Sequence, residues 1–166
     1  MKTFTNQNPT TLDEAVLLAR SAREDDQSVA FAAGGTDILQ LVKDRVNNRS
    51  GQGIPDVFVN LKSVEGADQI NSNSGGGVTI GGLITLTALS GDPGIRRDYT
   101  VLAEAAEKVG TLQIRNVGTL AGNVCQRPWC WYYRNGFPCY KSGGNECFSI
   151  AGENQLHAIF GGGPIF

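Results

Sequence analysis

The sequence lacks the features of several protein classes. Its 14 basic and 16 acidic residues give a formal net charge of −2, and no basic run predicts binding to nucleic acid. No apolar stretch approaches the roughly 20 residues of a membrane span. The N-terminal segment MKTFTNQNPT has no apolar core of a secretory signal. We therefore expect a cytoplasmic protein, with export to the periplasm alongside a signal-bearing partner as the alternative.

Common phosphate-binding and catalytic motifs are also missing. There is no G-x-G-x-x-G fingerprint of a dinucleotide site and no P-loop ending in Gly-Lys-Ser/Thr. The chain has one histidine, His157, which lies far along the sequence from any candidate partner. We therefore expect no Ser/His/Asp or Cys/His arrangement and no catalytic residue in this chain.

Glycine is the residue type that the sequence has in excess. The 166 residues include 22 glycines, about twice the usual share of roughly 7%. Most of them stand in pairs or triples beside apolar runs. This pattern is typical of tight turns and of backbone that approaches a ligand closely.

Hydrophobic periodicity predicts an alternation of helices and short strands. Thr11 and Glu14 form a capping box at the start of a helix over 11–24, with Leu12, Ala15, Val16, Ala19 and Ala22 on one face. The remaining predictions are a strand in 28–35, a helix in 36–46, a strand in 56–61, a strand and glycine corner turning helical in 77–89, and a helix in 99–110 that stops at Gly110.

The order of these elements predicts the fold class. Helix, strand, glycine loop, helix and strand make a βαβ-like opening, and the later strands, without long helices between them, favour antiparallel pairing. We therefore expect an α+β fold with two lobes, over residues 1–60 and 61–166.

Three glycine corners are candidates for ligand binding. They are AAGGTD (32–37), IGGLITLTAL (80–89) and QIRNVGTLAGNV (113–124), the last expected as an extended loop. Main-chain amides bared at such corners bind phosphate oxygens. Each corner alone is equally compatible with a plain turn.

Taken together and in this order, the three corners resemble the FAD-binding subunit of the molybdenum hydroxylases. This family includes the medium subunits of xanthine dehydrogenase and carbon monoxide dehydrogenase. The resemblance implies a two-lobed FAD-binding domain of the PCMH/VAO type, with a small βαβ lobe and a larger lobe built on a mixed or antiparallel sheet. It also implies FAD contacts at Ala33, Gly34, Gly35, Thr36, Asp37, Ile38, Leu39, Gly82, Leu83, Thr85, Thr119, Gly122 and Asn123.

The chain departs from the family pattern in two places. Ala121 stands where the family has the first of two glycines, and we expect its methyl group to narrow the approach of FAD slightly. Family subunits are also about twice as long and carry a C-terminal domain that is absent here. We expect the chain to be a fragment, or one piece of a split subunit completed by a second chain.

All four cysteines lie within 23 residues, with the spacing C-x4-C-x8-C-x7-C. The absence of a C-x2-C pair disfavours zinc, and two disulfides require an oxidising compartment. Four unrelated buried thiols are a further alternative. A [4Fe–4S] cluster, which accepts four thiolates at irregular spacing, fits best.

The segment around these cysteines resembles one branch of the family, the flavin subunit of periplasmic-type aldehyde oxidoreductases. This resemblance implies an iron–sulfur insertion over residues 124–150. It matches Cys130, Cys139 and Cys147, and Cys125 completes the count, with His157 as the alternative fourth ligand. The surrounding aromatic residues either exclude water from the cluster or form an ordinary core: Trp129, Trp131, Tyr132, Tyr133 and Phe137.

The resemblance implies an oxidoreductase subunit that passes electrons through FAD, between iron–sulfur clusters and an external acceptor. Its partners would be a large subunit with a molybdenum cofactor and a small subunit with [2Fe–2S] clusters. The aldehyde and xanthine dehydrogenases are the types of complex that this implies, and the redox chemistry belongs to the cofactors. The alternative is a non-catalytic binding module stapled by zinc or by disulfides.

Overall fold

The computed structural model describes residues 3–44, 46, 54–155 and 157. The chain forms two compact units: the first contains Met1–Ile38 and Pro55–Gln126, and the second contains Leu39–Ile54 and Arg127–Phe166. The two lobes expected at 1–60 and 61–166 stay a prediction. In the part of the chain that is described, no helix is both long and apolar enough to cross a membrane.

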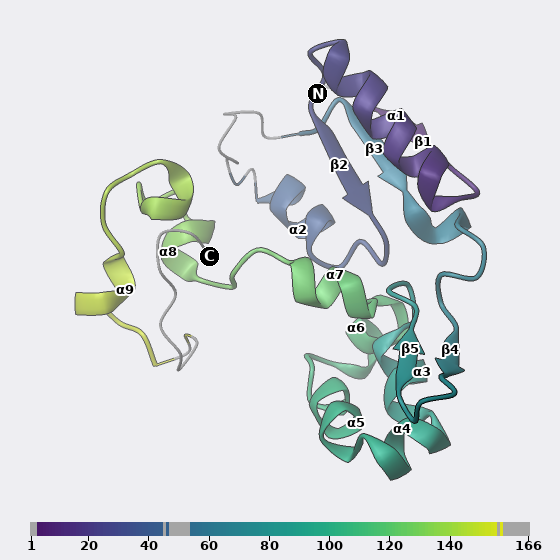
Figure 1. Cartoon of the computed structure of the whole chain (residues 1–166). Coiled ribbons are helices and arrows are strands. Elements are labelled where there is room, and N and C mark those ends of the chain that lie inside the picture. The colour runs from purple at the N-terminus through teal and green to yellow at the C-terminus, as the bar shows by residue number, and fades with distance from the viewer. Residues whose placement is uncertain (1–2, 45, 47–53, 156, 158–166) are drawn as a thin grey trace. The chain divides into compact units, whose positions relative to one another are not determined.

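A parallel sheet of three strands opens the first unit. Its order is β1 (Thr5–Gln7), β3 (Val57–Asn60) and β2 (Val29–Ala32), so that β3 lies in the middle (Figure 1). Val57 of β3 is opposite both Thr5 and Val29. The predicted strands in 28–35 and 56–61 are confirmed, whereas β1 is an addition that its polar sequence did not indicate.

Helix α1 (Leu12–Glu24) packs on this sheet through small residues. The Thr11 hydroxyl accepts a hydrogen bond from the Glu14 amide at 3.1 Å, as the capping box predicts. Ala15, Ala19 and Ala22 are buried against Val57 and Val59. The alanines bring the helix close to the sheet, so only a narrow stripe of α1 is covered.

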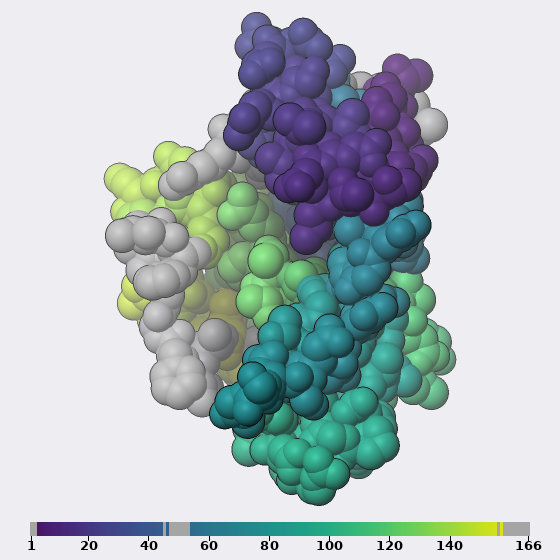
Figure 2. Space-filling view, turned by 45° about the vertical axis from the view of Figure 1, so that its right-hand side comes forward, coloured from purple at the N-terminus to yellow at the C-terminus, as the bar shows by residue number. Residues whose placement is uncertain are grey.

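Leu12 and Val16 lie at the margin of this stripe and stay 59% and 51% exposed. Figure 2 shows the N-terminal residues, α1 among them, on the molecular surface. The face predicted for the helix is therefore buried at its alanines alone.

A short antiparallel hairpin and a group of helices complete the first unit. Strands β4 (Ile70–Ser72) and β5 (Val78–Ile80) pair with Ile70 opposite Ile80, which agrees with the antiparallel pairing expected here. The helices are α3 (Leu86–Gly91), α4 (Pro93–Asp98), α5 (Thr100–Glu107), α6 (Leu112–Val117) and α7 (Leu120–Cys125), with a 3-10 turn at Leu61–Ser63. Their core consists of Ile84, Leu86, Leu89, Ile95, Ala103 and Ala106.

The structure corrects one sequence prediction in this unit. Residues 113–124, expected as an extended loop, fall mostly in the two short helices α6 and α7. Each is started by a threonine whose hydroxyl accepts a hydrogen bond from a main-chain amide, Thr111 from Ile114 and Thr119 from Gly122. These N-caps satisfy amides that the glycines would otherwise leave bare.

The second unit consists of short elements around a small core. It holds α2 (Ile38–Lys43) except for its first residue, together with α8 (Trp131–Arg134), α9 (Phe148–Ala151) and a 3-10 turn at Tyr140–Ser142. Val46, Tyr133 and Cys139 are buried, and Leu41, Cys130 and Phe148 pack against them. The helix predicted over 36–46 is shorter than expected, and residue 45 lies outside the described residues.

Candidate functional site

The first glycine corner presents a row of main-chain donors. β2 ends at Ala32, and the chain turns through Gly35, whose φ of +76° suits glycine. The amides of Ala33, Gly34, Gly35 and Thr36 have no hydrogen-bond partner among the described residues. Because these residues are only half-buried, the amides are positioned to donate to an anion from outside the protein.

This corner lies directly against the third one. A methyl group added at Gly34 would overlap the Val117 carbonyl oxygen and lie 2.9 Å from the Gly118 Cα. A methyl group at Gly118 would lie 3.5 Å from the Thr36 hydroxyl oxygen. Only glycine allows the two backbones to approach this closely.

The second and third corners are joined by hydrogen bonds. The amides of Leu120 and Ala121 donate to the carbonyl oxygens of Ile84 and Gly82, at 2.9 and 2.8 Å. In the opposite direction, the Leu86 amide donates to the Gly118 carbonyl oxygen at 3.0 Å. The three corners, far apart in sequence, are therefore brought together in one unit.

The amides of the third corner are used inside the protein. The Gly122 amide donates to the Thr119 hydroxyl at 3.1 Å, and the Asn123 amide donates to the Thr119 carbonyl oxygen at 2.9 Å. The amides of Leu120 and Ala121 are also hydrogen-bonded within the protein. These four amides of the third corner are therefore not available to a ligand, and the corner acts as a support for the first corner. Thr119 is buried, at 4% exposure.

The methyl group of Ala121 faces the second corner. A Cβ atom built at Gly82 would lie 3.0 Å from the Ala121 Cβ. The absence of a side chain at Gly82 therefore leaves room for the Ala121 methyl group.

The other residues predicted to contact FAD are distributed along these segments. Thr85 caps α3 by accepting a hydrogen bond from the Ala88 amide at 3.1 Å. Leu83 and Asn123 are half-buried. Ile38 begins α2, and Leu39, 55% exposed, belongs to the second unit.

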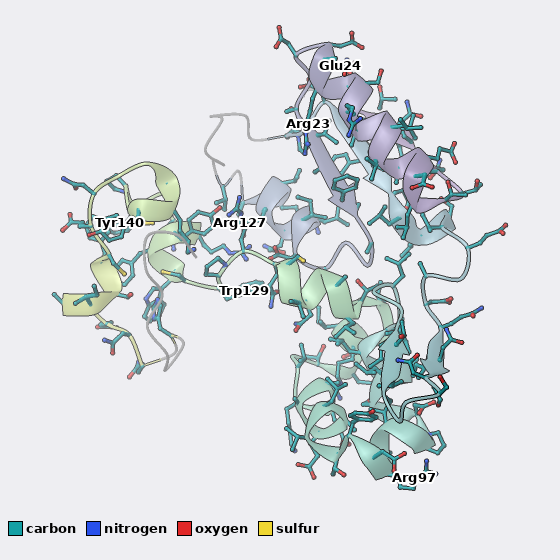
Figure 3. The ribbon with its side chains drawn as sticks, in the orientation of Figure 1. Arg23, Glu24, Arg97, Arg127, Trp129 and Tyr140 are labelled. Carbon is teal, nitrogen blue, oxygen red and sulfur yellow. The ribbon has the colours of Figure 1, made fainter. Side chains whose placement is uncertain are left out.

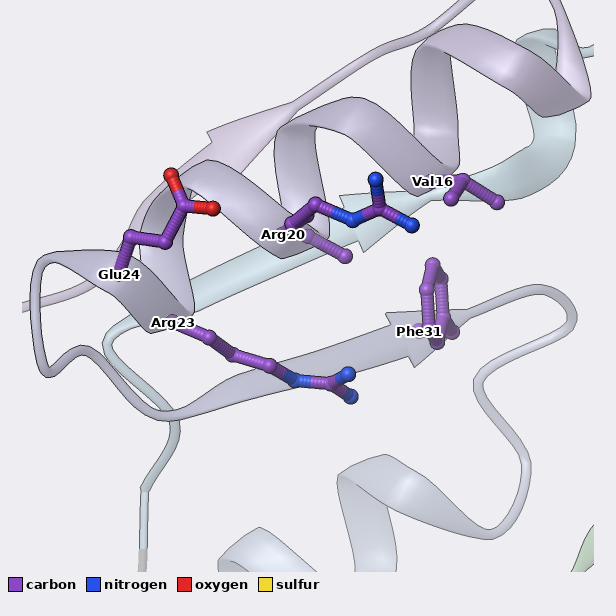
Figure 4. A pocket seen from close by; sticks show the side chains of 6 residues that line it. Val16, Arg20, Arg23, Glu24 and Phe31 are labelled. Carbon is purple, nitrogen blue, oxygen red and sulfur yellow. The ribbon is translucent and has the colours of Figure 1, made fainter.

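A separate groove lies between α1 and β2 in the first unit. Its volume is about 450 Å3, and it is lined by Val16, Ala19, Arg20, Arg23, Glu24 and Phe31. Figure 4 shows Arg20 and Arg23 reaching from α1 toward the side of β2 that carries Phe31, with Glu24 turned away. None of the glycine-corner residues lines this groove.

The four cysteines are free thiols divided between the two units. Cys125 ends α7 in the first unit and is exposed. Cys130, Cys139 and Cys147 belong to the second unit, where Cys139 is buried and the other two are half-buried. The structure pairs none of them in a disulfide.

Cys130 contacts His157, the residue expected as the alternative fourth ligand. Nε2 of His157 lies 3.1 Å from its sulfur, although 26 residues separate the two in the chain. The contact does not test the expectation that this chain has no catalytic residue, which stays a prediction. Sequence distance is a poor guide here because the cysteine segment folds back on itself.

Serine hydroxyls accompany the other two thiols of this unit. The Ser149 hydroxyl lies 3.1 Å from the Cys147 sulfur and lowers the pKa of that thiol by hydrogen bonding to its thiolate form. The Ser142 hydroxyl lies 3.5 Å from the Cys139 sulfur. The Ser149 contact favours the deprotonated form of Cys147, which is the form that binds metals.

The aromatic residues of the segment form a ring cluster. Tyr132 contacts Phe137, Phe148 and His157 with ring centroids 5.3, 6.1 and 6.0 Å apart. Tyr133 is buried beside Cys139 in the core, whereas Trp129 is 63% exposed. The Arg134 guanidinium lies 4.6 Å from the centre of the Trp129 ring, which Figure 3 labels.

The second unit contains thiols, which are the ligands that an iron–sulfur cluster takes. The structure does not bring these thiols together into one site. Cys130 and Cys139 share one apolar core, which would exclude water, and each of the three sulfurs lies within hydrogen-bond distance of a hydroxyl or an imidazole. His157 Nδ1 is a buried polar atom without a partner in the described part of the chain. No three potential ligands among the described residues are close enough together to hold one metal ion.

Comparison with known proteins gives one family and several relatives. Residues 2–128 match the family described as the FAD binding domain in molybdopterin dehydrogenase. The aldehyde oxidoreductase FAD-binding subunit PaoB of Escherichia coli is 34% identical over 163 residues, covering 97% of this chain and 48% of that protein. The nicotinate dehydrogenase FAD-subunit of Eubacterium barkeri is 36% identical over 124 residues, covering 75% of this chain and 39% of that protein.

A solved structure shows the same fold. Carbon monoxide dehydrogenase from Oligotropha carboxidovorans matches with a TM-score of 0.63 at 24% identity, over 74% of this chain and 39% of that one. The chain thus spans about half the length, or less, of the proteins that it matches. The family match ends at residue 128, before Cys130, Cys139 and Cys147, whereas the match to PaoB covers nearly the whole chain.

Proposed function

Because this chain belongs to the family of FAD-binding domains in molybdopterin dehydrogenases, we propose that it binds FAD and transfers electrons in a molybdenum hydroxylase complex. The complex would be of the aldehyde oxidoreductase type, since the similarity to PaoB covers 97% of the chain, including the cysteine segment. FAD supplies the chemistry, by accepting electrons from one redox centre and passing them to another acceptor.

One observation carries the proposal: the four consecutive amides of Ala33–Thr36, without partners in the described part of the chain, stand where a parallel strand ends. Amides that have no acceptor within the described part of the chain can donate to a bound diphosphate, which supplies the acceptors. The first corner would therefore hold the pyrophosphate of FAD. Gly118 and Val117 would form the wall behind it.

The second and third corners would fix the shape of the site. Their mutual hydrogen bonds hold the wall rigid against the first corner. Thr85, Gly82, Leu83, Thr119, Gly122 and Asn123 would then contribute contacts along the length of the nucleotide, with Ile38 and Leu39 following the pyrophosphate loop. The protein's part is to position FAD and to exclude water, and no proton transfer by this chain is required.

The cysteine segment would hold a [4Fe–4S] cluster, a one-electron centre in addition to FAD. We assign Cys130, Cys139 and Cys147 as ligands because they share one unit and each sulfur lies within hydrogen-bond distance of a hydroxyl or an imidazole. Cys125 stays the fourth ligand expected from the sequence alone. The partners would be a large subunit with the molybdenum cofactor and a small subunit with [2Fe–2S] clusters.

The test is cofactor analysis of the complex purified without oxygen, with Cys139→Ser as the variant. We expect FAD released by heat together with iron and acid-labile sulfide, and Cys139→Ser should lose the iron of this cluster and keep FAD. Tyr140→Phe is the matched control, since it changes the neighbouring residue and keeps every thiol. A purified protein with neither flavin nor sulfide, or with zinc in place of iron, would support the stapled binding module instead.

A further inference from the structure

The groove between α1 and β2 is a feature of the first unit that the binding of FAD does not use. Its volume is about 450 Å3. We propose that this groove is a docking site for a segment of a partner protein that carries an apolar side chain next to carboxylates. The inference rests on the proposed function only for the identity of the partner, which would be a subunit of the molybdenum hydroxylase complex.

The groove has apolar walls because α1 covers only part of the sheet. The helix packs through its alanines on the central strand β3, and β2 lies at the edge of the three-stranded sheet. Val29 of β2 packs against this core, whereas Phe31, two residues further along the same face, remains 45% exposed. Val16 of α1 lies across from Phe31 (Figure 4) and is 51% exposed. An aromatic ring and an aliphatic side chain therefore line the groove without filling it.

Two arginines make the groove complementary to negative charge. Arg20 and Arg23 reach from α1 toward β2 (Figure 4), and neither guanidinium has a hydrogen-bond or ion-pair partner among the described residues. Glu24 is turned away from them, and Glu14 accepts a hydrogen bond from the Thr10 amide at 2.7 Å. The whole chain has a formal net charge of −2, so this positive charge is local. We therefore expect the occupant of the groove to carry carboxylates.

The exposure of the walls favours a protein segment over a small molecule. Binding sites for small molecules enclose about 70–90% of the ligand surface, whereas Val16 and Phe31 are themselves about half exposed. A protein segment can place one apolar side chain between these two residues while the rest of the partner covers the groove. Aromatic residues and arginine are also the residue types that are enriched where proteins bind one another.

The experiment measures the dissociation constant between the full chain and the purified large and small subunits of its complex. Phe31→Ala removes the aromatic wall, and Arg20→Gln and Arg23→Gln each remove one positive charge. Lys108→Gln is the matched control, because it removes one exposed positive charge at the end of α5. The FAD content and the free energy of unfolding in urea are measured for every variant.

The expected result is weaker association in the three groove variants alone. Phe31→Ala should raise the dissociation constant by about tenfold or more, as the loss of an aromatic anchor does. The two arginine variants should raise it by roughly two- to fivefold at low salt and by less at high salt, because salt screens exposed ion pairs. Lys108→Gln should match the wild type, and FAD content and urea midpoints should be unchanged throughout.

Several results would overturn the inference. Equal dissociation constants for Phe31→Ala and the wild type, with FAD bound, would refute it and leave the proposed function standing. Weakening by Phe31→Ala alone would exclude an acidic occupant, and an equal effect of Lys108→Gln would assign the arginine effects to overall charge. Self-association of the chain that Phe31→Ala abolishes would place a second copy in the groove. Absence of association with the two subunits would also refute the inference, and a chain that lacks FAD as well would refute the proposed function with it.

Discussion

The substitution Gly34→Ala tests the close approach of the first and third glycine corners. The added methyl group would overlap the Val117 carbonyl oxygen and lie 2.8 Å from the carbonyl carbon, where ordinary contact begins at 3.4 Å. One of the two backbones must therefore move away from the other. The wall cannot retreat easily, because Gly118, Leu120 and Ala121 are each hydrogen-bonded to the second corner.

The energy of this overlap is that of an overpacked interior, about 1–3 kcal/mol. If residues 33–36 shift in the free protein, the strain is released there and reappears when FAD forces the loop back. FAD binding then weakens by roughly 5- to 150-fold. If the loop does not shift, the same free energy is lost from folding instead.

The assay therefore measures both quantities on the same preparation. FAD affinity is followed by the fluorescence of released flavin, and the free energy of unfolding is measured in urea. Gly75→Ala is the control, because a methyl group at Gly75, in the turn between β4 and β5, meets no atom within 4 Å. If Gly34→Ala matches Gly75→Ala in both measurements, the first corner does not depend on this contact and the argument fails.

Two further substitutions test other parts of the structure. Thr119→Val removes the hydroxyl that caps α7 and should lower the free energy of unfolding by about 1 kcal/mol. Thr119→Ser keeps a hydroxyl and should lower it less. Equal urea midpoints for the two variants would contradict the role of the hydroxyl as a cap. Gly144→Ala places a methyl group onto the Pro138 carbonyl and 3.2 Å from the Cys139 amide nitrogen. Because this displaces the backbone at Cys139, iron content should fall while FAD stays bound. Full iron content by metal analysis would show that iron binding tolerates a displaced Cys139 backbone.

Local sequence signals predicted a large part of the first unit. The capping box at Thr11 and Glu14 located the start of α1, because a side-chain hydrogen bond three residues away is a short-range property. The βαβ-like opening and the antiparallel pairing after it followed from apolar runs separated by glycine. β1 was missed because it is short and polar, with the sequence TNQ, and is recognisable as a strand only through its pairing with β3.

The third corner shows where local reasoning failed. Its alternation of small and polar residues suggested an extended loop, yet Thr111 and Thr119 cap two helices of six residues each. Helices this short carry too little periodicity to be recognised, and their stability comes from tertiary packing rather than propensity. The two capping threonines were the available signal.

The sequence by itself determined the family, the order of the three glycine corners and the confinement of the thiols to one segment. Only the tertiary structure decided that Gly34 lies against Gly118 and that His157 reaches Cys130. It also decided that the amides of Ala33–Thr36 have no partner in the described part of the chain, whereas the amides of the third corner are hydrogen-bonded. Each of these contacts joins residues separated by tens of positions. Such contacts depend on how the chain closes its loops and packs, which no local pattern of residues records.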